Sequence, residues 1–284
     1  MPAYHSPSTL ADALEILASG PVTIAAGCTD LYPATQAKAL PGDILDITAI
    51  SELSGITRDD AGWRIGAGVT WAELIRAHLP PAFDGLKRAA REVGSVQIQT
   101  AGTVAGNLCT ASPAGDGAPC LMTLDATVEL ASATATRSLP LAQFLTGARR
   151  TTLRPDEMVT AIRVPDTAAA GQGDFLKLGA RRYLVISIAM AAARFETEGG
   201  AITRAALSVG ACGPVAARLS GLERALEGVP LSAAVDKVTT DAVAPYLSPI
   251  DDIRGDAEYR IEAATELVRR LVLRCAEKRV GIAA

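Results

Sequence analysis

Histidine is scarce in this sequence, cysteine is scattered, and several motifs of catalytic centres are missing. The 284 residues include two histidines, His5 and His78, and five cysteines, none of them in a C-x-x-C pair. No H-E-x-x-H, G-x-S-x-G, S-x-x-K or G-x-x-x-x-G-K-[ST] motif occurs. These absences disfavour a metal centre, an iron–sulfur cluster carried by this chain alone, a serine hydrolase and a P-loop site. His78 precedes Pro80 by two positions, where a histidine at a helix end is the simpler interpretation.

Long apolar runs and a strong excess of one charge are also missing. No segment reaches the roughly 18 apolar residues of a membrane span, and the first residues lack the basic start and apolar core of a signal peptide. Lysine and arginine number 27 against 31 acidic residues, a net charge of −4, so no nucleic-acid surface is expected. The unpaired cysteines favour a reduced, cytoplasmic protein. With 49% hydrophobic residues, the chain can form one large or two modest domains.

The N-terminal part contains a regular alternation of helix and strand signals. Residues 8–20 predict a helix that Ser8 or Thr9 caps and Gly20 ends. The following segments predict a strand at 22–26, a helix at 31–40, a strand at 43–48, a hairpin that turns at 59–62 and a helix at 86–94. Strand, helix and strand between about 21 and 48 make a βαβ unit. Thr70 and Glu73 have the spacing of a capping box.

The C-terminal part changes in character after a stretch rich in Ala and Gly, residues 166–174, which we interpret as a linker. Strands are expected as a pair within 126–140 and at 157–165, 175–182, 185–196 and 201–212, and helices at 214–228, 231–243 and 256–280. The resulting division is a domain at 1–166, with subdomains at about 1–53 and 54–166, and an α+β domain at 174–284.

Two glycine-bearing segments are the candidates for binding chemistry. The first, "AAGCTDL" at 25–31, joins a strand to a helix, so its successive backbone N–H groups can form an anion site to which the helix dipole adds. Thr29 can donate a hydroxyl hydrogen bond. Asp30 is placed to cap the helix or to face a ribityl or ribose hydroxyl. A plain strand–helix turn with an Asp cap explains the same residues equally well.

The second segment, "TAGTVAGNLCTASPAGDGAP" at 100–119, is small and almost uncharged. Its glycines free the backbone, and its short polar side chains recur at intervals, which is the composition of a wall laid against a long polar ligand. We therefore expect twenty residues without regular structure that pack poorly and bind a ligand, with a structural loop as the alternative. Two phosphate-friendly segments on one chain indicate a dinucleotide such as FAD. "IGAGVTW" at 65–71 is no Rossmann site, because Trp71 replaces the third glycine.

These segments, taken together, resemble the medium, FAD-binding subunits of molybdenum hydroxylases, the group that includes xanthine dehydrogenase and carbon monoxide dehydrogenase. That family carries A-G-G-T-D-L, then T-I-G-G-N, then S-P-x-x-D-x-x-P and L-D-A. The corresponding segments here are "AAGCTDL" (25–31), "TVAGN" (103–107), "SPAGDGAP" (112–119) and "LDATVEL" (124–130). "IGAGVTWAEL", "FLKLGARR" and the C-terminal half are also similar, so the resemblance covers essentially the whole chain.

The resemblance implies a fold and a set of cofactor-binding residues. The fold is α+β: a two-part FAD-binding domain of the vanillyl-alcohol-oxidase (PCMH) type, followed by a smaller α+β domain of the CO dehydrogenase flavoprotein type. Residues 25–31 would wrap the pyrophosphate, Asp116 would hold a hydroxyl of the flavin chain, and Lys177 would stand near the flavin ring. The full implied set is Ile24, Ala25, Ala26, Gly27, Cys28, Thr29, Asp30, Leu31, Val93, Ile98, Gly102, Thr103, Gly106, Asn107, Cys109, Thr110, Ser112, Asp116, Met158, Val159, Lys177 and Tyr183, with Met158 and Val159 near the adenine.

Some positions depart from the family's pattern. We read Ala26 and Ala105 as standing where the common motifs have glycine, and a methyl group there would push the backbone away from a phosphate or forbid a positive φ. Val93 occupies the place where some relatives have an aromatic residue over the ring. Tyr183 is a candidate for stacking on the ring, and a core tyrosine is the equal alternative.

The resemblance also implies a function within a larger enzyme. The chain would be an electron-transfer flavoprotein subunit that holds FAD without a covalent bond, since no histidine lies in the two motifs. A large partner subunit would carry molybdopterin, a small one would carry two-iron iron–sulfur clusters, and NAD, oxygen or a quinone would accept the electrons. A dimer of heterotrimers is expected.

Two other readings remain at this point. One is a self-contained flavin oxidoreductase, in which Arg91, Glu92, Lys177 or Arg181 approaches the ring. The other is a nucleotide-binding or assembly module without catalysis.

Overall fold

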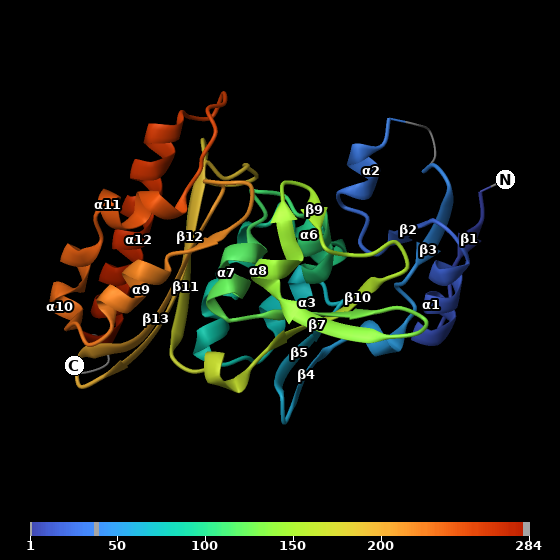
Figure 1. The fold of residues 1–284 in the computed structure, drawn as a ribbon, viewed down its shortest axis with the longest axis horizontal. Coiled ribbons are helices and arrows are strands. Elements are labelled where there is room, and N and C mark those ends of the chain that lie inside the picture. The colour runs from blue at the N-terminus through green and yellow to red at the C-terminus, as the bar shows by residue number, and fades with distance from the viewer. Residues whose placement is uncertain (1, 37–39, 281–284) are drawn as a thin grey trace.

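In the described part of the molecule, three larger sheets lie next to one another along its length, and a fourth sheet has two strands (Figure 1). The computed structural model describes residues 2–36 and 40–280. In Figure 1 the first sheet lies at the right, the second in the centre and the third at the left. Within the described ranges, no helix is both long and apolar enough to cross a membrane.

The first sheet is small and parallel, with the strand order β1-β3-β2. Its elements are β1 Tyr4–His5, α1 Leu10–Ser19, β2 Val22–Ala25, α2 Leu31–Ala34 and β3 Asp43–Asp46. Thr9 caps α1 by accepting a hydrogen bond from the Asp12 N–H. The βαβ unit is confirmed, but α2 ends at Ala34, because Thr35 is extended. Of the expected helix 31–40, residues 37–39 lie outside the described part of the chain.

The second sheet has five antiparallel strands in the order β4-β5-β10-β6-β7. Its strands are β4 Ile56–Asp59, β5 Gly62–Gly66, β6 Thr127–Ala131, β7 Thr136–Pro140 and β10 Met158–Val164, and a two-stranded hairpin of β8 Leu145–Gly147 and β9 Arg150–Thr151 stands apart. The helical elements are η1 Ser51–Leu53, α3 Trp71–Arg76, η2 Pro81–Phe83, α4 Asp84–Glu92, α5 Val96–Ala101, α6 Val104–Thr110, α7 Gly117–Thr123, α8 Leu141–Phe144 and η3 Asp166–Ala168. The predicted hairpin and the capping box of Thr70 and Glu73 are both present.

The glycine-rich stretch 100–119 is mostly helical, so the expectation of a structureless, poorly packed segment is wrong. It contains the end of α5, all of α6 and the start of α7, and every residue of α7 is buried. The small residues allow elements to approach closely rather than preventing packing. A Cβ at Gly117, for example, would come within 2.7 Å of the Trp71 ring. Low side-chain volume here serves dense packing between short helices.

The third sheet is antiparallel, in the order β11-β12-β13-β14. Its elements are β11 Gln172–Leu178, β12 Ala189–Glu198, β13 Ala201–Gly210, β14 Ala217–Arg218, α9 Ser220–Leu226, α10 Leu231–Ala234, η4 Val235–Lys237, α11 Thr240–Val243, η5 Ala244–Tyr246 and α12 Ala257–Val280. Helices α9 and α12 contact one face, and α4 and α7 contact this sheet from the second unit. Strands followed by helices is the expected α+β order. β11 begins at Gln172, so the last residues of the stretch 166–174 are strand rather than linker.

Helix α7 is held at its C-terminal end by two arginines of the third sheet. Arg194 of β12 donates from Nε to the Thr123 carbonyl at 2.9 Å. Arg218 of β14 donates to the Met122 carbonyl at 2.7 Å and to the Asp125 carboxylate at 2.8 Å. Because the last carbonyls of a helix lack partners within the helix, Arg194 satisfies the Thr123 carbonyl, and Arg218 adds a second donor to the Met122 carbonyl, which already accepts from the Asp125 N–H. They fix the position of α7, whose N-cap is Asp116.

Candidate functional site

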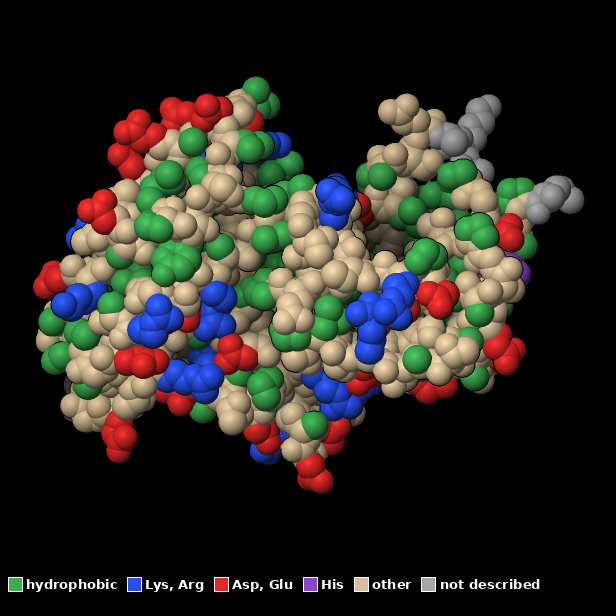
Figure 2. All heavy atoms as spheres, viewed as in Figure 1, with side chains coloured by type: hydrophobic (Ala, Val, Ile, Leu, Met, Phe, Trp, Pro, Cys, Tyr) green, Lys and Arg blue, Asp and Glu red, His purple; other side chains and the backbone are tan. Residues whose placement is uncertain are grey.

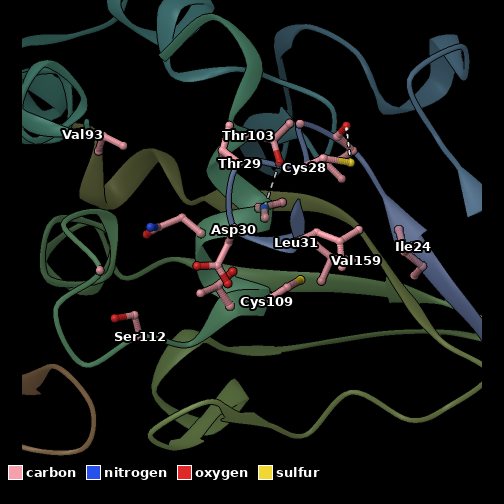
Figure 3. A pocket seen from close by; sticks show the side chains of 18 of the residues that line it. Ile24, Cys28, Thr29, Asp30, Leu31, Val93, Thr103, Cys109, Ser112 and Val159 are labelled. Carbon is pink, nitrogen blue, oxygen red and sulfur yellow. Dashed lines mark hydrogen bonds between the residues drawn. The ribbon is translucent and has the colours of Figure 1, made fainter. Parts of the chain in front are cut away.

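A cavity of ≈ 930 Å³ opens between the first and second units and reaches the edge of the third. Figure 2 shows the hollow from outside. Figure 3 shows side chains that line it. The walls come from the β2–α2 turn, from α6 and the segment that follows it, from the β8–β9 hairpin, and from β10 and β11. Cavities of this kind hold small molecules up to the size of large cofactors.

The β2–α2 turn packs directly on the connection between α5 and α6. A Cβ on Gly27 would lie 1.9 Å from the Ala101 carbonyl oxygen, so only glycine fits. A Cβ on Gly102 would lie 3.0 Å from Oγ1 of Thr29, so the same contact is tight from the other side. The two glycine-bearing segments, 75 positions apart in the sequence, therefore touch and form one wall of the cavity.

Asp30 does not cap α2, contrary to the first of its two expected roles. It occupies the N-cap position without a side-chain capping bond. Its carboxylate Oδ2 lies 2.7 Å from Nη1 of Arg149 in the β8–β9 hairpin. The ion pair is half-exposed, and both residues line the cavity. Helix α2 has four residues, so the anion-binding capacity of this turn lies in its backbone N–H groups more than in a helix dipole.

The second wall presents an unpartnered amide. Oδ1 of Asn107 is buried and has no hydrogen-bond partner among the described residues. The side chain lies against Gly115 and Gly117, where added Cβ atoms would come within 3.2 and 3.1 Å of Oδ1. Thr103 caps α6 by accepting from the Gly106 N–H at 3.0 Å, a bond drawn in Figure 3. A buried polar atom without a partner is rare and indicates a ligand group that completes it.

A buried ion pair closes the end of the cavity near the third sheet. Nζ of Lys177 lies 2.9 Å from Oδ2 of Asp116, and the hydroxyl of Ser187 donates to Oδ1 at 3.0 Å. The side chains of Lys177 and Asp116 are 7% and 8% exposed. Burial raises the pKa of Asp116, and Lys177 and Ser187 oppose that rise. Lys177 therefore brings its charge to the cavity already paired, and Asp116 has both carboxylate oxygens bonded within the protein.

Comparison with known proteins decides the family. A model described as the FAD binding domain in molybdopterin dehydrogenase matches residues 1–167, and the CO dehydrogenase flavoprotein C-terminal domain matches residues 174–275. The chain belongs to the FAD-binding subunits of molybdenum hydroxylases. Homologues in this group are named as the FAD-binding subunit of a xanthine dehydrogenase and the medium chain of a carbon monoxide dehydrogenase.

Individual relatives agree over nearly their whole length. The nicotinate dehydrogenase FAD-subunit of Eubacterium barkeri is 30% identical over 281 residues, which covers 94% of each chain. The carbon monoxide dehydrogenase medium chain of Afipia carboxidovorans is 30% identical over 278 residues and 95% of each chain. The solved structure of reconstituted CO dehydrogenase from Oligotropha carboxidovorans superposes with a TM-score of 0.89 at 27% identity, over 98% of both chains. The expected FAD-binding domain followed by a smaller α+β domain is thus confirmed.

The residues of this FAD-binding subunit fit the cofactor in kind. The cavity has the volume for a dinucleotide, the β2–α2 turn offers backbone N–H groups without bulky side chains, and Oδ1 of Asn107 has no partner in the described part of the chain. The turn where phosphates are expected offers neutral backbone N–H donors. The other wall offers amide and carboxylate groups. FAD is the ligand that this combination accommodates.

Eighteen of the residues predicted for the site line the cavity of this FAD-binding subunit, and four do not (Figure 3). Ala25 is buried inside β2, where its carbonyl accepts from the Ile47 N–H. Ile98 and Gly102 bond each other through the Gly102 N–H and the Ile98 carbonyl and do not line the cavity. Tyr183 is 59% exposed and lies under the Arg182 guanidinium, so it neither belongs to the core nor lines the cavity.

The two expected alanine departures of this FAD-binding subunit impose no backbone strain. Ala26 and Ala105 have negative φ, and Ala105 sits inside α6. Alignment on Thr29-Asp30-Leu31 places Cys28, not Ala26, against the second glycine of A-G-G-T-D-L. Cys28 has φ 55°, the left-handed region that glycine favours. The departure from glycine therefore lies at Cys28, two positions after Ala26, so the expectation for Ala26 is wrong and the strained residue is Cys28.

Several lining residues of this FAD-binding subunit escaped the sequence analysis. They are Trp71, Arg149, Arg154, Glu157, Leu184, Val185 and Ile186, among others. They come from elements far from the glycine motifs, and only the three-dimensional arrangement brings them to the cavity.

Proposed function

We propose that this chain accepts electrons from the iron–sulfur clusters of a small partner subunit and passes them to NAD or another acceptor, using FAD held without a covalent bond. The supporting observation is the ≈ 930 Å³ cavity whose walls are the two glycine-bearing segments. When bound, the flavin supplies the redox chemistry, taking single electrons and giving up pairs. Most of the cavity belongs to the proposed domain 1–166, and Lys177 comes from the proposed domain 174–284.

In this proposal each wall has a binding task. The N–H groups of the turn at 26–29 hold the diphosphate, and the Asn107 amide bonds a polar group of the cofactor. The Asp116–Lys177 pair presents a fixed, net-neutral dipole at the other end. Two walls anchored to separate sheets orient a long ligand without moving, which is the protein's main contribution to a cofactor reaction.

Non-covalent attachment is supported by the nucleophiles at the cavity. No histidine lines it within the described ranges, and the cysteines that do are Cys28 and Cys109. Burial and the Asp46 carboxylate raise the pKa of Cys28, whereas Cys109 is exposed. Since the thiolate is the reactive form, Cys28 is a poor nucleophile near neutral pH.

The proposed assembly has a molybdopterin-binding large subunit and an iron–sulfur small subunit, arranged as a dimer of heterotrimers in the cytoplasm. Support comes from the relatives, which are named as medium chains and FAD-binding subunits. No disulfide joins the cysteines of the described ranges, as expected for a reduced compartment.

The test is to purify the chain alone and then with its partner subunits. The isolated chain should bind FAD stoichiometrically, give flavin absorbance and quench flavin fluorescence, and show no substrate turnover. Turnover should appear when the partner subunits are added, and stopped-flow oxidation of the reduced complex by NAD, oxygen or a quinone identifies the acceptor. A chain that stays colourless after FAD is supplied would disprove the proposal.

A self-contained flavin oxidoreductase is the second candidate, and one residue favours it. Glu92 lines the cavity and is half-buried. Of the other expected ring-proximal groups, Arg91 bonds the Lys87 carbonyl and Arg181 bonds the carbonyls of Tyr183 and Leu184, and neither lines the cavity. Substrate turnover by the isolated chain that Glu92→Gln abolishes would establish this function instead.

A further inference from the structure

The tip of the β8–β9 hairpin places a cation at the cavity. Arg149 has φ 57° at this tip, and its backbone N–H donates to the Ala111 carbonyl at 2.8 Å. Ala111 is the C-cap of α6, the helix that carries Asn107. The backbone of Arg149 is thus fixed to one wall of the site, and its side chain reaches Asp30 next to the other wall.

Three cations line the cavity in the described part of the chain, and they differ in how firmly they are held. Lys177 is buried and paired with buried Asp116 at 2.9 Å. Arg154 lies 3.6 Å from Glu157, which already receives two 2.7 Å hydrogen bonds from Arg137. Arg149 has one recorded contact, through Nη1, to a carboxylate that is 51% exposed. Its guanidinium can exchange this partner readily, because exposed ion pairs contribute little stability, and of the two exposed arginines Arg149 is the one that pairs with the residue following the turn at 26–29.

The charge balance of the cavity explains why such an exchange matters. Asp30, Glu92, Asp116 and Glu157 oppose the three cations, so the lining has no positive excess for a diphosphate. Asp30 directly follows the turn at 26–29, where it would repel a phosphate. A guanidinium between them offers donors in a fork that matches phosphate oxygens.

We propose that Arg149 is a phosphate-anchoring residue of this site, and that Asp30 is its partner when no phosphate is bound. This inference rests on the proposed binding of FAD. Arg149 then pairs with the diphosphate, and the Asp30 carboxylate acts as a competitor that lowers the affinity. The two members of one ion pair therefore have opposite effects on ligand binding, which a purely structural salt bridge cannot produce.

The experiment compares four variants of the full flavin-free chain: Arg149→Gln, Arg149→Lys, Asp30→Asn and Arg150→Gln. Arg150 is the matched control, since it is exposed on the same hairpin and does not line the cavity. Titrations by flavin fluorescence use FAD and riboflavin, which lacks both phosphates, at low and high salt. Thermal unfolding confirms that each variant is folded.

For Arg149→Gln we expect about tenfold weaker FAD binding, equal to about 1.4 kcal/mol, with riboflavin binding unchanged within about twofold. Arg149→Lys should lose less FAD affinity than Arg149→Gln. The difference in FAD affinity between Arg149→Gln and the parent should shrink at high salt. Asp30→Asn should bind FAD as well as the parent or better, and Arg150→Gln should match the parent.

Three results would overturn the inference: FAD affinity of both Arg149 variants within about twofold of the parent, an equal loss for riboflavin, or a loss in Asp30→Asn as large as in Arg149→Gln. Failure of the proposed function looks different, because the parent chain itself then binds no flavin. In that case, calorimetry with ADP still tests Arg149, since ADP carries the diphosphate without the flavin, and equal ADP affinity of parent and Arg149→Gln refutes the anchoring role.

Discussion

The Asp116–Lys177 pair is the residue-scale feature with the largest electrostatic consequence. Lys177→Met removes the cation that offsets the burial of Asp116, and breaking a buried pair in this way costs about 3 kcal/mol or more of the free energy of unfolding at neutral pH. Asp116→Asn together with Lys177→Met removes both charges, so this double variant should recover most of the loss. Urea unfolding of the flavin-free chain at pH 7 measures both. If the double variant lost as much free energy of unfolding as Lys177→Met and Asp116→Asn lose in sum, the coupling between the two residues would be contradicted.

The pH dependence of the Lys177→Met variant follows from the same pair. Burial raises the folded-state pKa of Asp116 above its unfolded value, and loss of Lys177 raises it further. A carboxyl with a raised folded pKa stabilises the fold below its unfolded pKa of about 3.9 and loses that contribution as the pH rises through the folded pKa. The stability deficit of Lys177→Met relative to the double variant should therefore grow between about pH 4 and pH 7. A deficit that shrinks over this range would show that Asp116 titrates in the opposite sense.

Cys28 carries the strained backbone of the β2–α2 turn. An L-residue in the left-handed region costs about 1–2 kcal/mol, and a β-branched residue fits worst there. Cys28→Gly should keep or raise the melting temperature and retain FAD affinity, whereas Cys28→Val should lower both. Cys109 in helix α6 is the control, because helix propensity makes Gly worse than Val there. If the glycine and valine variants ranked in the same order of melting temperature at both positions, backbone strain at Cys28 would be refuted.

At the scale of elements, periodicity and capping predicted most helices and strands. The spacing of Leu10, Leu14 and Leu17, the cap at Thr9, and the Thr70–Glu73 box all act within one element, so the sequence alone reveals them. The stretch 100–119 was misjudged because its helices depend on tertiary contacts: Gly117 fits under Trp71, and Gly27 fits on Ala101. The site motifs were visible because glycines mark close approaches, while the lining from the β8–β9 hairpin and residues 184–186 required the fold.

The contact between the β2–α2 turn and the α5–α6 connection gives a prediction at the same scale. Gly27→Ala would place a Cβ 1.9 Å from the Ala101 carbonyl, so the turn must shift at a cost of about 1–3 kcal/mol. The shift also moves the backbone N–H groups proposed for the diphosphate, and FAD binding should weaken more than tenfold, or by more than about 1.4 kcal/mol. Gly20→Ala is the control, since nothing lies within 4 Å of its added Cβ. Thermal unfolding and flavin fluorescence read out both effects, and equal behaviour of the two variants would argue against this contact.

At the scale of the whole molecule, α7 couples the two domains and the site. The helix begins beside Asp116, which bonds Lys177 of β11, and ends at the carbonyls that Arg194 and Arg218 hold from β12 and β14. Desolvation lowers the pKa of Arg194, and the carboxylates of Glu196 and Asp125 oppose this shift. The cofactor cavity and the third sheet therefore share one structural element. Loosening the arginine contacts is expected to reach the cavity through α7.

Unfolding of an Arg194 variant tests this coupling. Both tryptophans, Trp63 and Trp71, lie in the second unit, so their fluorescence reports that unit, whereas far-UV circular dichroism reports the whole chain. In the parent chain the two urea transitions should coincide, as expected for cooperative unfolding.

Arg194→Met leaves the Thr123 and Ala170 carbonyls and Glu196 without this donor, at a cost of about 3 kcal/mol. The circular dichroism midpoint should then fall below the fluorescence midpoint. Arg204→Met removes a 42% exposed arginine that also pairs with Asp125, and it should shift both midpoints together by less than the equivalent of about 1 kcal/mol. Coincident transitions in Arg194→Met would show that α7 does not carry the coupling.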